Sequence, residues 1–138
     1  MVDGPTTATD LDQTESNREI VRSFVDNVLV QGQLEKLEQY IHNDHFTQHS
    51  PQIADGLSAL RTALQTTSDN GITIKYNRLH RLLAEGCFVL SVSEGTLNDV
   101  HTSFYDLFRI FEGKLVEHWD TIETVSPRTE WKNENGKF

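Results

Sequence analysis

Residues 117–120 read Glu-His-Trp-Asp and lie in a stretch whose pattern is otherwise that of a β-strand. His118 and Asp120 are two residues apart, so a strand would point both to the same face as the aliphatic Val116 and Ile122. An imidazole and a carboxylate are the groups that general acid–base chemistry uses most. The spacing therefore indicates either a hydrated face or the lining of a pocket in which an acid and a base act together.

The composition restricts the classes of protein that are possible. The 138-residue chain is long enough for one domain with a hydrophobic core, and its 36% hydrophobic and 24% charged residues are typical of a soluble globular protein. A net charge of −9 argues against nucleic acid or an anionic membrane as a partner. Cys87 is the single cysteine, which excludes a disulfide framework. No apolar run suits a membrane span or a signal peptide, so we expect a cytoplasmic protein.

The elements that must position these residues are helices first and strands afterwards. Polar residues 1–14 are predicted to form a disordered tail, and residues 126–138 a polar C-terminal tail. Apolar spacing predicts helices at about 15–31, 33–41 and 57–67, and strands at about 72–83, 87–95, 100–111 and 114–125. This order is typical of an α+β fold, so we expect one domain, residues 15–125, with three helices over the concave face of a curved antiparallel sheet.

The turn between the last two strands decides which side chains share a face, because a shift of one residue turns each side chain over. A two-residue turn at Glu112-Gly113 would pair Phe111 with Lys114, and a three-residue turn would pair Ile110 with Lys114. We favour the three-residue turn, because glycine suits its left-handed position and glutamate is a poor first residue for a two-residue turn. The even-numbered residues of both strands then share one face.

This register places two carboxylates and an imidazole on one largely apolar face. Asp106 would lie opposite His118, and Phe104 opposite Asp120. Charged groups there cost several kcal/mol each unless they are paired or hydrated. One interpretation is a buried structural pair of Asp106 and His118, with Asp120 capping a strand end. We favour the other, a ligand cavity under the helices.

The segment TQHSP…DG and the strands YDLFRIFEGKLVEHWDTIE closely resemble the SnoaL-like polyketide cyclases, within the nuclear transport factor 2-like superfamily. The resemblance spans residues 15–125 and implies a cone-shaped α+β fold. It also implies ring closure of an aromatic polyketide by intramolecular aldol condensation, without metal or cofactor. Asp120 matches the acid–base carboxylate of that family, and Asp106 falls where some cyclases have a supporting histidine. His118 would complete the catalytic group.

The chain also departs from its relatives. Cys87 and Val92 replace residues common on the second strand, so the identity of the substrate does not carry over. Ketosteroid isomerases share the fold, but Ser50 stands where they have the base aspartate, which argues against steroid isomerisation. Limonene-epoxide hydrolases use an Asp-Arg-Asp trio, for which Arg78 is a weak match.

Several further residues are expected to contact the substrate. His49 is expected at the pocket mouth, and His80 either lines the cavity or lies in the core. Phe104, Phe108 and Ile122 complete the expected substrate-binding set. His42, His45 and His49 have the spacing of metal ligands on a helix, but their segment is predicted to be extended, which scatters them over both faces and argues against a metal site.

The sequence thus predicts a cofactor-free acid–base enzyme, a lyase or isomerase, acting on a small hydrophobic or aromatic carbonyl compound. The alternatives are a ligand-binding domain of the same fold without turnover, or an epoxide hydrolase- or isomerase-like relative. The outer face of the sheet would expose Tyr105, Leu107 and Trp119 together. Such an apolar patch predicts a homodimer through the convex face of the sheet.

Overall fold

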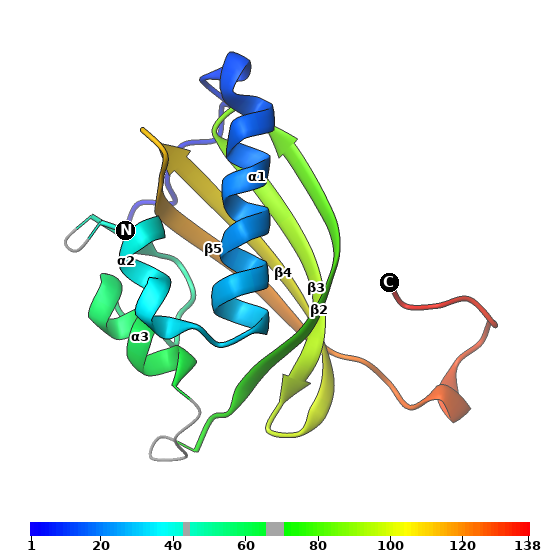
Figure 1. Ribbon diagram of the computed structural model, residues 1–138. Coiled ribbons are helices and arrows are strands. Elements are labelled where there is room, and N and C mark those ends of the chain that lie inside the picture. The colour runs from blue at the N-terminus through cyan, green and yellow to red at the C-terminus, as the bar shows by residue number, and fades with distance from the viewer. Residues whose placement is uncertain (43–44, 66–70) are drawn as a thin grey trace.

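The computed structural model describes residues 1–42, 45–65 and 71–138. Five strands form one curved sheet in the order β1-β5-β4-β3-β2, and the helices pack on one of its faces (Figure 1). The α+β fold with helices over the concave face is therefore confirmed. Its four long strands are β2 (Ile74–Glu85), β3 (Phe88–Leu97), β4 (Val100–Phe111) and β5 (Lys114–Thr124), all antiparallel to their neighbours among the four.

Three helical segments cover the sheet, as the apolar spacing predicts. A short 3₁₀ turn, η1 (Leu11–Gln13), leads into α1 (Thr14–Phe24), which continues as a π-helical segment, η2 (Val25–Val30). The second segment joins η3 (Leu34–Lys36) to α2 (Leu37–Tyr40), and the third is α3 (Leu57–Leu64). No helix in the described part of the chain is long and apolar enough to cross a membrane.

The helices are held on the sheet by one buried cluster. Val21, Phe24, Val25 and Val28 form a continuous buried stripe on α1 and η2. Phe24 packs edge-on against Phe108 of β4, with ring centroids 5.5 Å apart. Burial of such aromatic and aliphatic side chains is the main source of stability in a domain of this size. It also fixes the distance between α1 and the central strands.

A fifth strand, β1 (Thr47–Gln48), lies in the segment that the sequence predicts to be extended, but its pairing with the sheet is not predicted. It pairs in parallel with β5, and Gln48 lies beside His118. The sheet is therefore mixed, although its four long strands are antiparallel. The pairing brings the loop that follows β1 to the edge of β5, next to His118 and Asp120.

The predicted turn between β4 and β5 is wrong. Phe111 pairs with Lys114 across a two-residue turn, in which Glu112 and Gly113 have φ angles of 49° and 78°. Positive φ at both central residues is the type I′ geometry that matches the twist of a hairpin. The preference for that twist outweighs the poor fit of glutamate at the first position.

A β-bulge in β5 then returns the side chains that follow it to the face on which the sequence predicts them. The register shifts between Arg109 and Ile110, so that Ile110 pairs with Leu115 and Arg109 with Glu117. Val116 is the extra residue, and it lies on the outer face rather than with His118 as expected. Beyond the bulge, Phe108 lies opposite His118 and Asp106 opposite Asp120. The opposing pairs differ from the prediction, but the even-numbered residues from His118 onward do face the helices.

The N-terminal segment, which the sequence predicts to be disordered, lies against the outer face of the sheet. The indole nitrogen of Trp119 donates to the carbonyl of Asp3 at 3.1 Å, and the Cys87 amide donates to the carbonyl of Thr9 at 2.8 Å. A Cβ atom on Gly4 would lie 2.5 Å from a carboxylate oxygen of Glu117, so only glycine fits there without displacement. The segment covers part of the face that is predicted to form a dimer.

The homodimer stays a prediction. Tyr105 on the same outer face is 42% exposed, and Leu107 and Trp119 are half-buried. Light scattering at micromolar protein concentration is expected to give the mass of two chains. A mass of one chain would contradict this prediction, and truncation of residues 1–8 would then show whether the N-terminal segment prevents association.

Candidate active site

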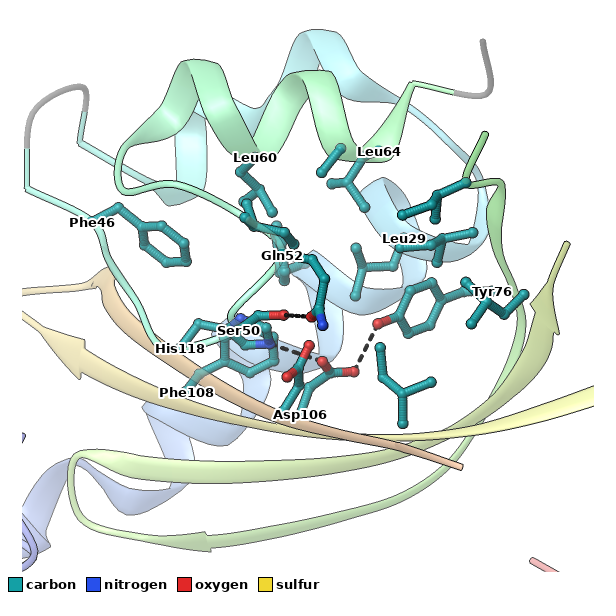
Figure 2. Close-up of a pocket in the computed structure, with 18 of the residues that line it drawn as sticks. Leu29, Phe46, Ser50, Gln52, Leu60, Leu64, Tyr76, Asp106, Phe108 and His118 are labelled. Atoms are coloured by element: carbon teal, nitrogen blue, oxygen red, sulfur yellow. Dashed lines mark hydrogen bonds and ion pairs between the residues drawn. The ribbon is translucent and has the colours of Figure 1, made fainter. Parts of the chain in front are cut away.

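A cavity of about 480 Å³ lies between the concave face of the sheet and the helices (Figure 2). Its upper wall is apolar and includes Phe24, Leu29, Leu60 and Leu64 from α1, η2 and α3. Polar groups gather on its floor, which β4 and β5 form. A mostly apolar cavity with a few convergent polar groups is the usual form of a small-molecule site.

Asp106, His118 and Asp120 lie together on that floor. Each offers a ligand or hydrogen-bonding atom, and these atoms all lie within 4.8 Å of one another. Asp106 is 2% exposed and His118 is 7% exposed, whereas Asp120 is half-buried and faces the cavity. The alternation of β4 and β5 beyond the bulge is what brings them to one face.

A chain of hydrogen bonds runs through the floor from β2 to β1. The Tyr76 hydroxyl donates to Asp106 Oδ2 at 2.9 Å, and Asp106 Oδ1 lies 2.8 Å from His118 Nε2. The other ring nitrogen of His118 lies 2.8 Å from Gln48 Oε1. Burial, and then the carboxylate of Asp106, hold the pKa of Tyr76 well above its usual value, so Tyr76 stays a hydroxyl donor.

Aromatic rings fix the plane of the His118 imidazole. Phe108 is stacked on it with ring centroids 5.0 Å apart, and Phe46 is stacked with centroids 6.4 Å apart. A ring stacked against two others and bonded at both nitrogens has few accessible rotamers. His118 is therefore part of a rigid floor, while Asp120 is the member of the group that a ligand can reach.

The acidity of Asp120 is perturbed by its surroundings. Partial burial raises its pKa above the ordinary value of 3.8, and the nearby Asp106 acts in the same direction. His118 and a hydrogen bond from Ser50 oppose the rise but do not cancel it. A raised pKa makes a carboxylate a stronger base, so it holds an abstracted proton more readily than an ordinary aspartate does.

The three residues could in principle supply ligands to a divalent cation. However, His118 Nε2 and Asp106 Oδ1 are bonded to each other at 2.8 Å, and Tyr76 occupies the second oxygen of Asp106. The two atoms best placed for coordination are thus already joined through a proton. This geometry favours an acid–base pair over a metal centre.

Two of the expected substrate-binding residues, Phe108 and Ile122, do line the cavity. Phe104 does not: it is fully buried beside the floor and stacks on Tyr76, with ring centroids 4.4 Å apart. Its contact positions the Tyr76 ring rather than a ligand.

The two expected histidines lie on the outer face, so the predicted place of His49 at the pocket mouth is wrong, and so are both alternatives for His80, the cavity and the core. His49 bonds to Glu117 at 2.7 Å and stacks on Trp119, because the residues on either side of it in the β1 segment point inward. His80 bonds to Glu94 at 2.8 Å. Register shifts in β2 on both sides of residue 79 turn His80 away from the cavity face that Tyr76 occupies.

Four residues of the site were not predicted to have a role in it. Tyr76 and Gln48 end the hydrogen-bond chain, and Ser50 and Gln52 line the cavity beside Asp120. For Gln48, Ser50 and Gln52, the available signal in the sequence is the polar run before and after Pro51, which the parallel pairing of β1 brings to the floor. Arg78 is exposed, so an Asp-Arg-Asp trio does not form. No lysine or arginine lines this cavity among the described residues.

In sequence, the chain matches no family model and no curated protein. Solved structures do match. A candidate ketosteroid isomerase from Kribbella flavida is 16% identical, with a TM-score of 0.67 over 91% of this chain and 94% of that one. A SnoaL-like polyketide cyclase from Agrobacterium tumefaciens is 12% identical, with a TM-score of 0.60 over 78% and 91%. An LEH-like epoxide hydrolase from M. tuberculosis is 17% identical, with a TM-score of 0.60 over 80% and 85%.

These likenesses show the fold. The chain has the nuclear transport factor 2-like fold, the fold that SnoaL-like cyclases and ketosteroid isomerase-like proteins share. Because this fold carries several chemistries, the reaction has to be argued from the residues on the cavity floor.

Proposed function

We propose that this protein is a cofactor-free acid–base enzyme that moves a proton next to a carbonyl group of a small, neutral, hydrophobic compound. The observation that carries the proposal is Asp120, a half-buried carboxylate of raised pKa on the floor of an apolar cavity. Aldol ring closure, as in SnoaL-like cyclases, is the form of this chemistry that the resemblance of the strand motif favours. The cyclase and isomerase-like structures that share the fold support the same class of reaction.

Asp120 acts first as the base. Its carboxylate takes a proton from the carbon next to a carbonyl group, and the electron pair of that C–H bond forms the enolate. The enolate carbon attacks a second carbonyl carbon of the same molecule, which forms a C–C bond and an alkoxide. Protonated Asp120 then returns its proton to the alkoxide, and the carboxylate is restored. Proton transfer by a positioned group contributes about 10²–10⁴-fold to the rate.

Gln52 offers its side-chain NH₂ group as a donor for the enolate oxygen, whereas the Ser50 hydroxyl is engaged with Gln52 Oε1 and Asp120. Figure 2 shows the Gln52 side chain reaching down toward Asp106 from the wall of the cavity. The hydroxyl of Tyr76 and the His118 ring are engaged in the hydrogen-bond chain, which leaves them less free to bind a ligand. One well-placed donor to a developing oxyanion contributes about 10²–10³-fold.

The charge of the cavity argues for a neutral substrate. Two carboxylates lie on the floor, and among the described lining residues there is no lysine or arginine to balance an anionic ligand. Bringing a further negative charge into an apolar cavity beside Asp120 is unfavourable. Ketones, esters and 1,3-dicarbonyl compounds fit these conditions.

Deuterium exchange tests the proposal without knowledge of the natural substrate. The protein would be incubated in D₂O with a panel of neutral aromatic 1,3-dicarbonyl compounds, and α-deuteration would be followed by NMR. We expect exchange faster than in buffer or with heat-unfolded protein for the compounds that bind. Tight binding of several compounds without any added exchange would contradict the enzymatic function and favour a binding domain.

The pH dependence of exchange follows from the raised pKa of Asp120. Only the ionised carboxylate can accept a proton, so the rate should rise with pH and level off above the pKa. Because burial raises that pKa, the midpoint should lie above the ordinary value of 3.8. The measurement is the exchange rate at subsaturating substrate across the pH range in which the protein stays folded. A midpoint at or below the ordinary value would contradict the role of Asp120.

A further inference from the structure

The orientation of the Gln48 side chain is fixed by a backbone group. Gln48 Oε1 accepts the Ser50 amide hydrogen at 2.9 Å, and the same atom lies 2.8 Å from His118 Nδ1. A backbone N–H can only donate, so the atom facing it has to be the amide oxygen. Turning the amide over would set its NH₂ group against the Ser50 N–H. It would also gain nothing, because the present Nε2 position has no partner in the described part of the chain.

The oxygen of Gln48 in turn determines which nitrogen of His118 carries a proton. An amide oxygen can only accept, so His118 Nδ1 has to donate and is therefore protonated. The neutral ring then has a bare lone pair on Nε2. That lone pair would face a carboxylate oxygen of Asp106 at 2.8 Å, which is repulsive unless a proton lies between them.

The contact between Asp106 and His118 consequently holds one proton. The proton either sits on Nε2, giving an imidazolium and a carboxylate, or sits on Asp106 against a neutral ring. In both cases the pair has no net charge. Tyr76 donates to the other oxygen of Asp106 and adds no charge. Beyond these groups, only Asp120 among the described cavity-lining residues is ionisable, and the rings beside His118 are the phenyl groups of Phe46 and Phe108.

We propose that Gln48 is a positioning residue that holds His118 in the form protonated on Nδ1 and thereby keeps the Asp106–His118 pair neutral beside Asp120. The meaning of this for catalysis rests on the proposed function. Without the acceptor at Nδ1, a neutral His118 can instead donate from Nε2 to an ionised Asp106. The pair would then carry a negative charge next to the base, which opposes ionisation of Asp120.

The ¹⁵N NMR spectrum of the histidine rings tests the proposal and needs no substrate. The His118 signals would be assigned by their loss in His118→Gln, and the spectra would be recorded near neutral pH. We expect a proton on Nδ1 in the native protein and in Gln48→Glu, whose carboxylate oxygen can accept from both Ser50 and His118. In Gln48→Leu we expect the proton to be on Nε2. Gln39→Leu is the matched control, because Gln39 is exposed on α2, and it should leave the His118 signals unchanged.

Two results would overturn the proposal. The first is a bare Nδ1 in the native protein, which depends on no variant and so on no change of folding. The second is an unchanged, Nδ1-protonated His118 in a folded Gln48→Leu protein, with folding checked by its thermal unfolding curve.

Deuterium exchange then separates this inference from the proposed function. If both hold, the midpoint of the exchange profile in Gln48→Leu should move to higher pH, because the base sits beside an anionic pair. A shifted tautomer with an unshifted midpoint would overturn the positioning role. If neither the native protein nor any variant catalyses exchange, the proposed function is contradicted. The NMR spectra then decide the tautomer assignment on their own.

Discussion

Replacement of Asp120 by asparagine is expected to slow α-proton exchange by about 10²-fold or more, while the affinity for a neutral ligand changes little. Asparagine has the shape and hydrogen-bonding capacity of the aspartate but cannot accept a proton at neutral pH. Exchange rates and ligand-binding isotherms of the two proteins provide the comparison. Gln39→Leu, at an exposed residue that does not line the cavity, should exchange at the native rate.

The same variant is expected to keep or gain stability at neutral pH. Partial burial raises the pKa of Asp120, so the folded protein binds this proton more tightly than the unfolded chain does. The contribution of Asp120 to stability is therefore fully present below the unfolded-state pKa and is lost as pH rises through the folded-state pKa. Urea unfolding at neutral and at acidic pH should show the advantage of asparagine shrinking toward low pH. A destabilised Asp120→Asn protein with native exchange would show that Asp120 is a structural residue.

The second large effect is expected at Asp106. Replacement by leucine removes the partner of both Tyr76 and His118 on the buried floor, and breaking a buried pair in this way costs about 3–5 kcal/mol of unfolding free energy. Replacement by asparagine should cost far less. With His118 protonated on Nδ1, the asparagine NH₂ can donate to Nε2 and its oxygen can accept from Tyr76, so both hydrogen bonds are kept.

Urea unfolding of the two Asp106 variants provides the measurement. The leucine variant should unfold at a clearly lower urea concentration than the native protein, and the asparagine variant close to it. Equal losses in both variants would mean that asparagine cannot replace the hydrogen bonds. In that case His118 would be held as an imidazolium with two donating nitrogens.

The sequence predicts the elements of this fold better than it predicts their pairing. Helical and strand periodicities are local, and the observed bounds of β4 agree with the predicted ones. The turn at Glu112-Gly113 is one residue shorter than predicted, yet the cavity face of β5 is as predicted, because the bulge at Val116 shifts the register by one further residue in the same sense. The two shifts add to two residues, which changes the opposing pairs but leaves His118 and Asp120 on the predicted face, because side chains alternate with a period of two.

The positions of His49 and His80 were predicted wrongly, because each depends on an interaction that local sequence does not encode. β1 is two residues long, and its direction is set by its pairing with β5. That pairing turns His49 outward and brings Gln48 and Ser50 to the floor. In β2, the register shifts against β3 turn His80 outward while Tyr76 stays inside. The candidate acid–base residues could thus be found from strand alternation, whereas their hydrogen-bonding partners required the assembled sheet.

The most direct test compares two midpoints in the same native protein. The first is the pH at which the Asp120 carboxylate titrates, measured from its ¹³C NMR signal and assigned by its absence in Asp120→Asn. The second is the pH midpoint of α-proton exchange at subsaturating substrate, which reports the ionisation of the base in the free enzyme. We expect the two midpoints to coincide, at a pH above 3.8. An Asp120 signal that titrates at or below that value, or away from the kinetic midpoint, would contradict the assignment of Asp120 as the base.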